Sequence, residues 1–384
     1  MERLDITKRK FDKPLLWSIV ALVVIGTIML YSSSIAVSIS KTNGESSTYY
    51  LVAHLKRLVL SIFALIIFMH LDYRKLKSVS TLLIIIAIAL LGYTKIWYML
   101  NNMSSPGRWL YFGSFSIQTS DIARLALIIF LAAFMTQKRH QLQNFVKGFL
   151  PPVLIMTVII GLIMLQPDFS TGIMLCIIGT MLLFIGGARF IQLSAAGITA
   201  VIITIPMMLS IPYSRTRITS WLNGNEDVVN SGYQITQSLI SLGNGGLMGA
   251  GLGNSIAKNQ FLPTPHTDFI FAIIGEETGY LGAGILLTIF LIIFQRGVKI
   301  AKNANDSFGV LLALGISFSL ILYAFVNAAV VTNIIPVTGL PMPLISYGGS
   351  NILTNMIALG ILLNISQSKR SVTHKQGWKP HNDG

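Results

Sequence analysis

Residues 307–331 read SFGVLLALGISFSLILYAFVNAAVV, a run without one charged side chain. A helix of about 20 apolar residues crosses the roughly 30 Å hydrocarbon layer of a membrane, so this stretch predicts a transmembrane helix. Similar apolar runs recur along the whole length and leave no room for a sizeable soluble domain. The sequence therefore predicts a single polytopic membrane domain over residues 1–384.

The composition agrees with a membrane protein. Of the 384 residues, 53% are hydrophobic and 11% are charged, and the mean hydropathy is +0.69, whereas a soluble domain carries about 25% charged residues. The formal net charge is +14, but basic residues beside membrane spans follow from topology, so we expect no nucleic-acid partner. The single cysteine, Cys176, lies inside an apolar run, which excludes a disulfide framework or a cysteine metal site.

Apolar runs that end at charged residues, Pro or Gly mark the spans. The first run follows basic residues, yet no cleavage site of a signal peptide follows it, and we keep it as a helix. The predicted fold class is an all-α integral membrane protein with about ten transmembrane helices. The expected spans are residues 15–34, 51–70, 79–97, 121–136, 149–165, 170–187, 191–211, 268–295, 307–331 and 345–364.

Basic residues are distributed unevenly between the connecting segments. With a cytoplasmic N-terminus, most of the 28 Lys and Arg residues fall in the cytoplasmic tails and loops. The positive-inside rule therefore predicts cytoplasmic tails at 1–14 and 366–384. Residues 212–267 then form a large outer loop between helices seven and eight, whose many Gly and Asn residues suggest turns and close backbone approach rather than a folded domain.

Charged side chains inside a bilayer are costly and by default mark a functional site. The outer halves of the predicted helices collect eight charged residues: Lys56, Arg57, Asp121, Arg124, Asp168, Asp268, Glu276 and Glu277. For Asp121 and Arg124 the alternative to a functional role is an intrahelical pair, and for Asp168 it is a helix cap.

Asp268 opens an apolar run that leads to Glu276 and Glu277. Asp268 and Glu276 are expected on one face of one helix, about 12 Å apart. That separation is too large for a pair of carboxylates acting on one glycosidic bond. We therefore assign the chemistry to Asp268, the carboxylate nearer to water, and keep a plain helix cap as the alternative.

Four basic residues lie in the predicted outer segments, where the positive-inside tendency disfavours them: Arg108, Arg215, Arg217 and Lys258. Each could be a surface charge. Together they suit an anionic ligand that arrives from the outer leaflet, such as a lipid pyrophosphate. His266, next to the acid, is expected as a hydrogen-bond partner rather than a metal ligand.

Two stretches carry a family resemblance: GAGLGNSIAKNQFLPTPHTDFIFAIIGEE at 249–277 and PVTGLPMPLISYGGS at 336–350. Together with Gly107-Arg108-Trp109, Gln118-Thr-Ser-Asp121, Arg124 and Gln166-Pro-Asp168, they resemble the SEDS family (shape, elongation, division and sporulation). The resemblance is closer to the division-type FtsW branch than to the elongation-type RodA branch. Thr119, Asp121 and Arg124 stand where the family usually has Pro, Glu and Lys.

The resemblance implies a bacterial enzyme of the cytoplasmic membrane that polymerises lipid II into peptidoglycan strands at the outer face, for cell division or cell shape. Asp268 matches the proposed catalytic acid of the family and would take the proton from the acceptor 4-hydroxyl as it attacks the anomeric carbon, with inversion. Arg and Lys side chains, or a bound Mg²⁺ or Mn²⁺, could supply positive charge to the leaving pyrophosphate. The implied partners are the polyprenyl-pyrophosphate-linked glycan, membrane lipid and a class B penicillin-binding protein.

The expected substrate-binding set combines the polar residues above with two positions of the second stretch. The substrate-binding set is Arg57, Arg108, Asp121, Arg124, Gln166, Asp168, Arg215, Arg217, Lys258, Glu276, Ser346 and Tyr347.

The alternatives to a lipid II polymerase are a lipid II flippase or transporter, which should carry charged groups near the midplane, and a scaffold, which explains neither Asp268 nor the outer basic residues. The acids cluster towards one face, beside the large loop, and this favours the polymerase.

Overall fold

The computed structural model describes residues 11–101, 107–113, 115–222, 231–259, 262–263 and 265–368. Within these ranges, 10 helices are long and apolar enough to cross a membrane, which confirms the expected all-α membrane fold. They are α1 (Lys13–Lys41), α2 (Tyr49–His70), α3 (Arg74–Leu100), α4 (Thr119–Gln137), α5 (Leu150–Met164) together with the π-helical turn Phe145–Phe149 that precedes it, α6 (Phe169–Gly186), α7 (Phe190–Ser210), α10 (Ile270–Lys302), α11 (Ser307–Val331) and α12 (Gly349–Gln367).

Each expected span overlaps one of these helices, and the differences lie at the ends. Helix α1 continues seven residues beyond the expected end, through a mixed apolar and polar stretch that ends at Lys41, and α3 begins five residues earlier than expected. Most of the two expected tails, residues 1–10 and 369–384, lies outside the described residues.

Helices α4, α11 and α12 form the centre of the bundle. Helix α12 packs against α2, and α4 packs against α3, α6 and α11. Glycines permit the closest approaches: a Cβ on Gly360 of α12 would come within 2.6 Å of the Leu65 carbonyl oxygen on α2. Small residues of this kind let membrane helices pack backbone to backbone. Helix α7 is the opposite case, because only 6% of the residues in its most apolar 18-residue stretch are buried inside the protein.

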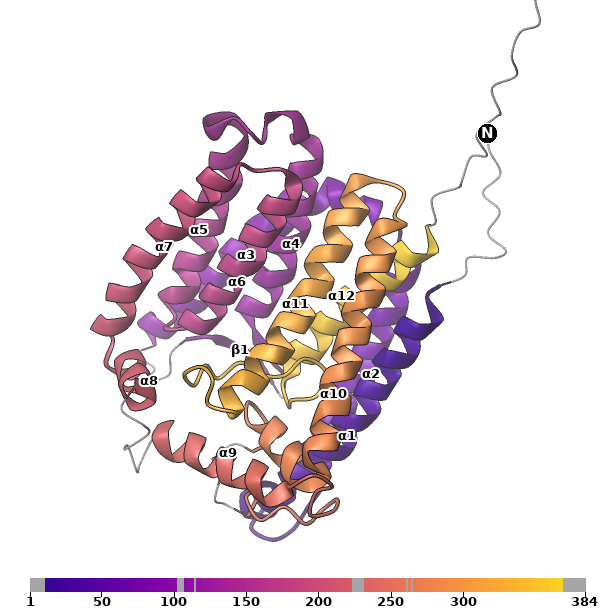
Figure 1. The fold of residues 1–384 in the computed structure, drawn as a ribbon, viewed down its shortest axis with the longest axis vertical. Coiled ribbons are helices and arrows are strands. Elements are labelled where there is room, and N and C mark those ends of the chain that lie inside the picture. The colour runs from indigo at the N-terminus through magenta and orange to yellow at the C-terminus, as the bar shows by residue number, and fades with distance from the viewer. Residues whose placement is uncertain are drawn as a thin grey trace, which may run out of the picture.

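The start of α1 and the ends of α10 and α12 meet at one end of the bundle. The Asp12 backbone N–H donates to Ser366 Oγ at 3.1 Å, and Arg296 Nε donates to Asp12 Oδ1 at 3.0 Å. Figure 1 shows that the opposite end carries two further helices, α8 (Pro212–Leu222) and α9 (Ser231–Gly245). The expectation of turns in 212–267 is therefore wrong for these two segments, which are helical.

Helix α9 follows an amphipathic pattern that the count of Gly and Asn residues obscured. Ile235, Ser238 and Leu242 are buried and recur at helical spacing. The segment 98–120 also holds an unexpected element, an antiparallel hairpin of β1 (Trp109–Phe112) and β2 (Phe115–Gln118), with Trp109 opposite Gln118. Strands of four residues are too short to give a clear alternating pattern.

Helix α10 is interrupted at Gly279, whose φ of 70° and ψ of −175° are not helical. The backbone groups released by the break are satisfied by a neighbouring segment. The Tyr280 N–H donates to the Gly246 carbonyl at 2.9 Å, and the Ala250 N–H donates to the Glu276 carbonyl at 2.9 Å. Irregular backbone is tolerated in a membrane protein only where protein or water satisfies it in this way.

The close backbone approach expected of the Gly-rich stretch is present at this break. A Cβ on Gly249 would lie 2.3 Å from the Glu277 carbonyl oxygen, so a larger residue there would push the two segments apart. The expectation of one helix that contains both Asp268 and Glu276 is wrong, because α10 begins at Ile270 with Phe269 as its N-cap. Asp268 lies in the preceding turn and is not the cap residue.

Candidate active site

Asp268 is held in place by contacts to both its side chain and its backbone. The Thr267 hydroxyl donates to Asp268 Oδ1 at 2.7 Å. The Asn327 side chain, near the C-terminal end of α11, donates to the Asp268 carbonyl at 2.7 Å and to the Leu340 carbonyl at 2.8 Å. One buried amide therefore joins the turn before α10 to the segment 332–348, and the half-buried carboxylate is positioned between them.

Arg217 approaches the carboxylate from α8. Its Nη1 donates to the Val337 carbonyl at 3.3 Å, which docks α8 on the segment 332–348. The position that a Cβ would take on Gly339 lies 3.7 Å from Arg217 Nη1 and 3.7 Å from Asp268 Oδ2. Gly339 has a φ of +70°, a conformation that favours glycine. The guanidinium and the carboxylate therefore border one small space that the missing side chain leaves open.

The two motif stretches of the sequence meet beside this space. The Tyr347 N–H donates to the His266 carbonyl at 2.9 Å, and Ser346 Oγ accepts from the Met342 N–H at 2.9 Å, which stabilises the intervening turn. The ring centroids of His266 and Tyr347 are 5.5 Å apart, and Arg57 lies 4.8 Å from the Tyr347 centroid. Arg57, Ser346 and Tyr347 thus adjoin the segment that carries Asp268.

The imidazole of His266 is neutral at physiological pH. Burial lowers its pKa to about 4, and the positive charge of Lys41 acts in the same direction. A neutral imidazole can pack against aromatic rings, and the His266 ring centroid lies 4.5 Å from that of Tyr50. Its buried Nδ1 has no hydrogen-bond partner among the described residues, so the expected hydrogen-bonding role is not borne out. Burial likewise raises the pKa of Tyr347, so its phenol stays protonated.

Lys258 is buried in an ion pair rather than exposed in a loop. Its Nζ lies 2.9 Å from Glu277 Oε1, and the Ser32 hydroxyl donates to the same oxygen at 2.6 Å. Three segments, α1, the turn at 255–258 and the first half of α10, are joined at this point. The Lys258 charge is thereby matched inside the protein, which favours a structural role.

Glu276 is also committed to contacts within the protein. Its carboxylate accepts from the Ser255 hydroxyl and from the backbone N–H of Ile256 at 3.0 Å, and the residue is 1% exposed. Its carboxylate therefore caps the turn that carries Lys258. The placement of Glu276 favours a structural role as well.

Asp121 and Arg124 belong to a buried polar network at the start of α4. They form the expected intrahelical pair, with 3.9 Å between Arg124 Nη2 and Asp121 Oδ1. Ser350 of α12 donates to Asp121 at 2.7 Å, and Asn355 accepts from Arg124 at 2.9 Å. The guanidinium also lies 4.4 Å from the centroid of Tyr323 on α11. The pair therefore joins α4 to α11 and α12.

The Gly-Arg-Trp and Gln-Pro-Asp elements of the sequence lie against each other. Arg108 Nε donates to the Gln166 carbonyl at 3.0 Å, and the Gln166 side chain donates to the Leu91 carbonyl at 3.0 Å. Asp168 caps α6 by accepting from the Thr171 N–H at 3.4 Å, and it accepts from the Gln118 side chain at 3.2 Å. The cap alternative for Asp168 is thus confirmed.

The structure separates the expected site residues by location. Around the segment 332–348 lie the expected catalytic residue Asp268 and four members of the binding set: Arg57, Arg217, Ser346 and Tyr347. Arg215 is on the same helix as Arg217 but is exposed. The remaining members are bound within the protein, in the contacts given above: Arg108, Asp121, Arg124, Gln166, Asp168, Lys258 and Glu276.

Sequence reasoning missed two residues that shape the site, Asn327 and Gly339. Asn327 carried a signal, because it is a polar residue within an otherwise apolar span, where an amide normally bonds to another helix or loop. Gly339 carried none, because its importance depends on which side chains approach it.

A metal site built only from protein ligands does not fit the described residues, since no three His, Cys, Asp or Glu side chains among them could hold an ion. At Asp268 the available groups are one carboxylate, the Thr267 hydroxyl and a guanidinium, and the guanidinium already provides positive charge.

Comparison with known proteins covers nearly the whole chain. Stage V sporulation protein E of Bacillus subtilis is 37% identical over 366 residues, which cover 95% of this chain and 100% of that protein. The probable peptidoglycan glycosyltransferase FtsW of Trichlorobacter lovleyi is 34% identical over 93% of both chains. A chain from a peptidoglycan synthase complex has the same fold, with a TM-score of 0.74 at 22% identity over 93% of this chain and 98% of that one.

The model of a family of cell cycle proteins that comprises FtsW, RodA and SpoVE matches residues 13–371. This range spans all the membrane helices and every residue of the candidate site. The expected SEDS membership is confirmed: the chain belongs to the FtsW/RodA/SpoVE family of cell cycle proteins.

Proposed function

We propose that this protein is an inverting peptidoglycan glycosyltransferase that polymerises lipid II into glycan strands. The observation that carries the proposal is the space bordered by the Asp268 carboxylate and the Arg217 guanidinium beside Gly339. The relatives whose names state an activity are probable peptidoglycan glycosyltransferases, and these names favour an enzyme over a flippase.

In this proposal Asp268 is the general base. Its carboxylate accepts the proton of the acceptor 4-hydroxyl while that oxygen attacks the anomeric carbon of the donor and the pyrophosphate leaves. A general base must lie within hydrogen-bond reach of the proton it removes. The hydrogen bonds from Thr267 and Asn327 fix the position of Asp268 before the substrate arrives, and such preorganisation is a major source of catalytic rate.

Arg217 is the candidate for the leaving group. A guanidinium binds phosphate oxygens in a planar, charge-assisted arrangement, and Arg217 is close enough to Asp268 to act on the same bond. Arg57, over the ring of Tyr347, is a second cation on the border of this region. Two cations beside one carboxylate suit a reaction in which a pyrophosphate departs as a base takes a proton.

The membrane orientation completes the proposal. The end of the bundle with Asp268 would face the outside of the bacterial cytoplasmic membrane, and both termini would lie in the cytoplasm. Arg74, Lys138 and Lys299 are placed at the opposite end with the start of α1, as the positive-inside rule requires. The fold match to a complex described as coordinating polymerization and crosslinking supports a class B penicillin-binding protein as partner.

Polymerisation and transport can be separated in one preparation. The purified full chain, reconstituted in vesicles with a cross-linking partner, should convert labelled lipid II into long glycan strands that a muramidase digests. A flippase would instead move labelled lipid II across the bilayer and leave it monomeric. Transport without polymer, with the partner present, would reject the glycosyltransferase.

A further inference from the structure

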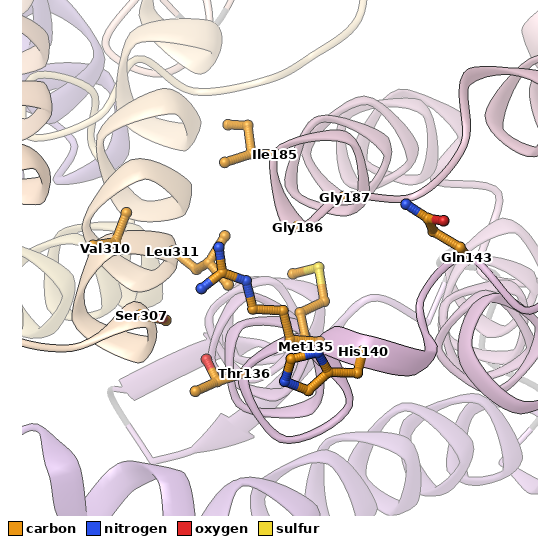
Figure 2. A pocket seen from close by; sticks show the side chains of 11 residues that line it. Met135, Thr136, His140, Gln143, Ile185, Gly186, Gly187, Ser307, Val310 and Leu311 are labelled. Atoms are coloured by element: carbon orange, nitrogen blue, oxygen red, sulfur yellow. The ribbon is translucent and has the colours of Figure 1, made fainter.

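A cavity of about 600 Å³ opens at the end of the bundle opposite to Asp268. Figure 2 shows its three walls: Met135, Thr136 and His140 at the end of α4, Gly186 and Gly187 at the end of α6, and Ser307, Val310 and Leu311 at the start of α11. The 33 residues of α10, about 50 Å of helix at 1.5 Å per residue, separate this end from the candidate active site. The cavity is therefore a separate site.

The cavity is basic. Arg139 and His140 line it, and none of its described lining residues is acidic. In the part of the chain that the structure describes, the Arg139 side chain makes no hydrogen bond or ion pair. Asp306, which directly precedes the lining residue Ser307, is occupied: it accepts from the Tyr73 hydroxyl at 2.7 Å and pairs with Arg74 at 3.2 Å. The Arg139 charge is thus available to a ligand.

The rim of the cavity is apolar on one side. Ile185 lines the cavity and is 42% exposed, while its neighbours Phe184 and Phe190 are 58% and 74% exposed. Side chains like these, at the junction of α6 with the little-buried α7, face hydrocarbon in a membrane. A ligand with an anionic head and an apolar tail would match both parts of the site, whereas a soluble anion would use only the basic part.

We propose that this cavity binds the phosphate of an anionic membrane lipid, with Arg139 as its main cation and the acyl chains lying along α6 and α7. Basic pockets between helices at a membrane face are suited to such head groups. The surrounding basic residues Lys138, Lys147 and Arg189 would attract anionic lipid to this end without contacting it in the cavity. The proposal does not depend on the glycosyltransferase activity.

Lys138 provides a matched control, because it is exposed, adjacent in sequence and not part of the cavity lining. The thermal stability of the purified full chain in detergent is measured with added phosphatidylglycerol, phosphatidylcholine of the same acyl chains, or inorganic phosphate. Phosphatidylglycerol should stabilise the wild type and Lys138→Gln at similar concentrations. Arg139→Gln should need about ten- to a hundredfold more lipid, the value of a charge-assisted contact. Val310→Phe, which narrows the cavity, should also weaken the effect.

Three outcomes would overturn the proposal. Equal responses of Arg139→Gln and Lys138→Gln would show general charge attraction instead of a site. Equal stabilisation by phosphatidylcholine would remove the role of the anionic head group. Stabilisation by inorganic phosphate as strong as that by phosphatidylglycerol would identify a soluble-anion site, with no part for the acyl chains.

Discussion

The side-chain amide of Asn327 donates a hydrogen bond of 2.7 Å to the backbone carbonyl of Asp268. The same amide donates to the Leu340 carbonyl at 2.8 Å, so one residue of α11 sets the distance between the two segments that border the candidate site. Asn327 touches no reacting atom in the proposed mechanism. It is a positioning residue.

Asn327→Leu should reduce polymerisation strongly, because the change preserves approximate volume while it removes both hydrogen bonds. Displacement of a catalytic group by about 1 Å can cost about a hundredfold in rate. The loss should appear in kcat more than in KM. Initial rates of polymer formation, normalised to folded protein, test this expectation.

Asn364→Leu is the matched control for Asn327. Asn364 is equally buried and also bonds backbone groups, the Tyr73 N–H at 3.0 Å and the Met69 carbonyl at 2.8 Å, but at the other end of the bundle. Both variants should lose stability by about 1–3 kcal/mol. If their rates per folded molecule fall equally, Asn327 has no special relation to Asp268.

Arg217 and Arg215 should differ, although the sequence places both in the expected binding set. Arg217→Gln should lower polymerisation about ten- to a hundredfold, because the leaving pyrophosphate loses a charge-assisted contact. Arg215→Gln should change it little, because this side chain is exposed on α8. The comparison uses limiting lipid II. Equal losses in both variants would indicate general attraction of an anionic substrate.

Lys258→Met should destabilise the protein rather than weaken substrate use alone. The substitution leaves Glu277 as a buried carboxylate without its cation, and such losses cost about 3–5 kcal/mol. The double variant Lys258→Met, Glu277→Met should recover much of the stability, because a buried ion pair can often be replaced by apolar residues. Thermal unfolding in detergent measures both effects. A stable single variant with a raised KM would restore Lys258 to the binding set.

Single cysteines test the orientation. After replacement of Cys176, cysteines at Met248, which is 80% exposed, and at Lys299 should behave differently in intact cells. An impermeant thiol reagent should label only Met248→Cys, because this position lies at the end with Asp268 and Lys299 lies at the other. Labelling of Lys299→Cys alone would reverse the orientation and place the candidate site in the cytoplasm.

The membrane helices could be predicted from the sequence because a helix that crosses the bilayer needs about 20 mostly apolar residues, and hydropathy averaged over that length detects such segments directly. The break at Gly279 could not be predicted, because it is stabilised by hydrogen bonds with residues 246–251. These residues are distant from Gly279 in the sequence and approach it only in the folded protein. For the same reason α8 and α9 could not be predicted: α8 is docked on the segment 332–348 by the Arg217 hydrogen bond, and α9 packs against α10.

The site was predictable in its residue types and less so in its contacts. Asp268 stands out because a carboxylate beside an apolar run is costly. Lys258 stands out because the positive-inside tendency disfavours basic residues in an outer segment, yet its partner Glu277 is 19 residues further along the chain, so spacing alone could not distinguish a binding cation from half of a buried ion pair.

Asp268→Asn should abolish polymerisation while folding, insertion and partner binding stay intact. The change keeps the size of the side chain and its ability to accept from Thr267, but removes the basic oxygen. Loss of a positioned general base costs about 10² to 10⁴ in rate, and the nearest carboxylates along the chain, Glu276 and Glu277, are engaged with Ser255 and Lys258 and cannot substitute. Polymer yield over time, with the partner present, measures the loss.

The stability of Asp268→Asn is the control for this prediction. The contact from Asn327 is made to the backbone carbonyl, which survives the substitution, and Phe269 rather than Asp268 occupies the N-cap of α10. The melting temperature of Asp268→Asn should therefore stay close to that of the wild type. Because stability is preserved, any loss of rate is attributable to the missing base, and near wild-type polymerisation by the folded variant would remove Asp268 from the mechanism.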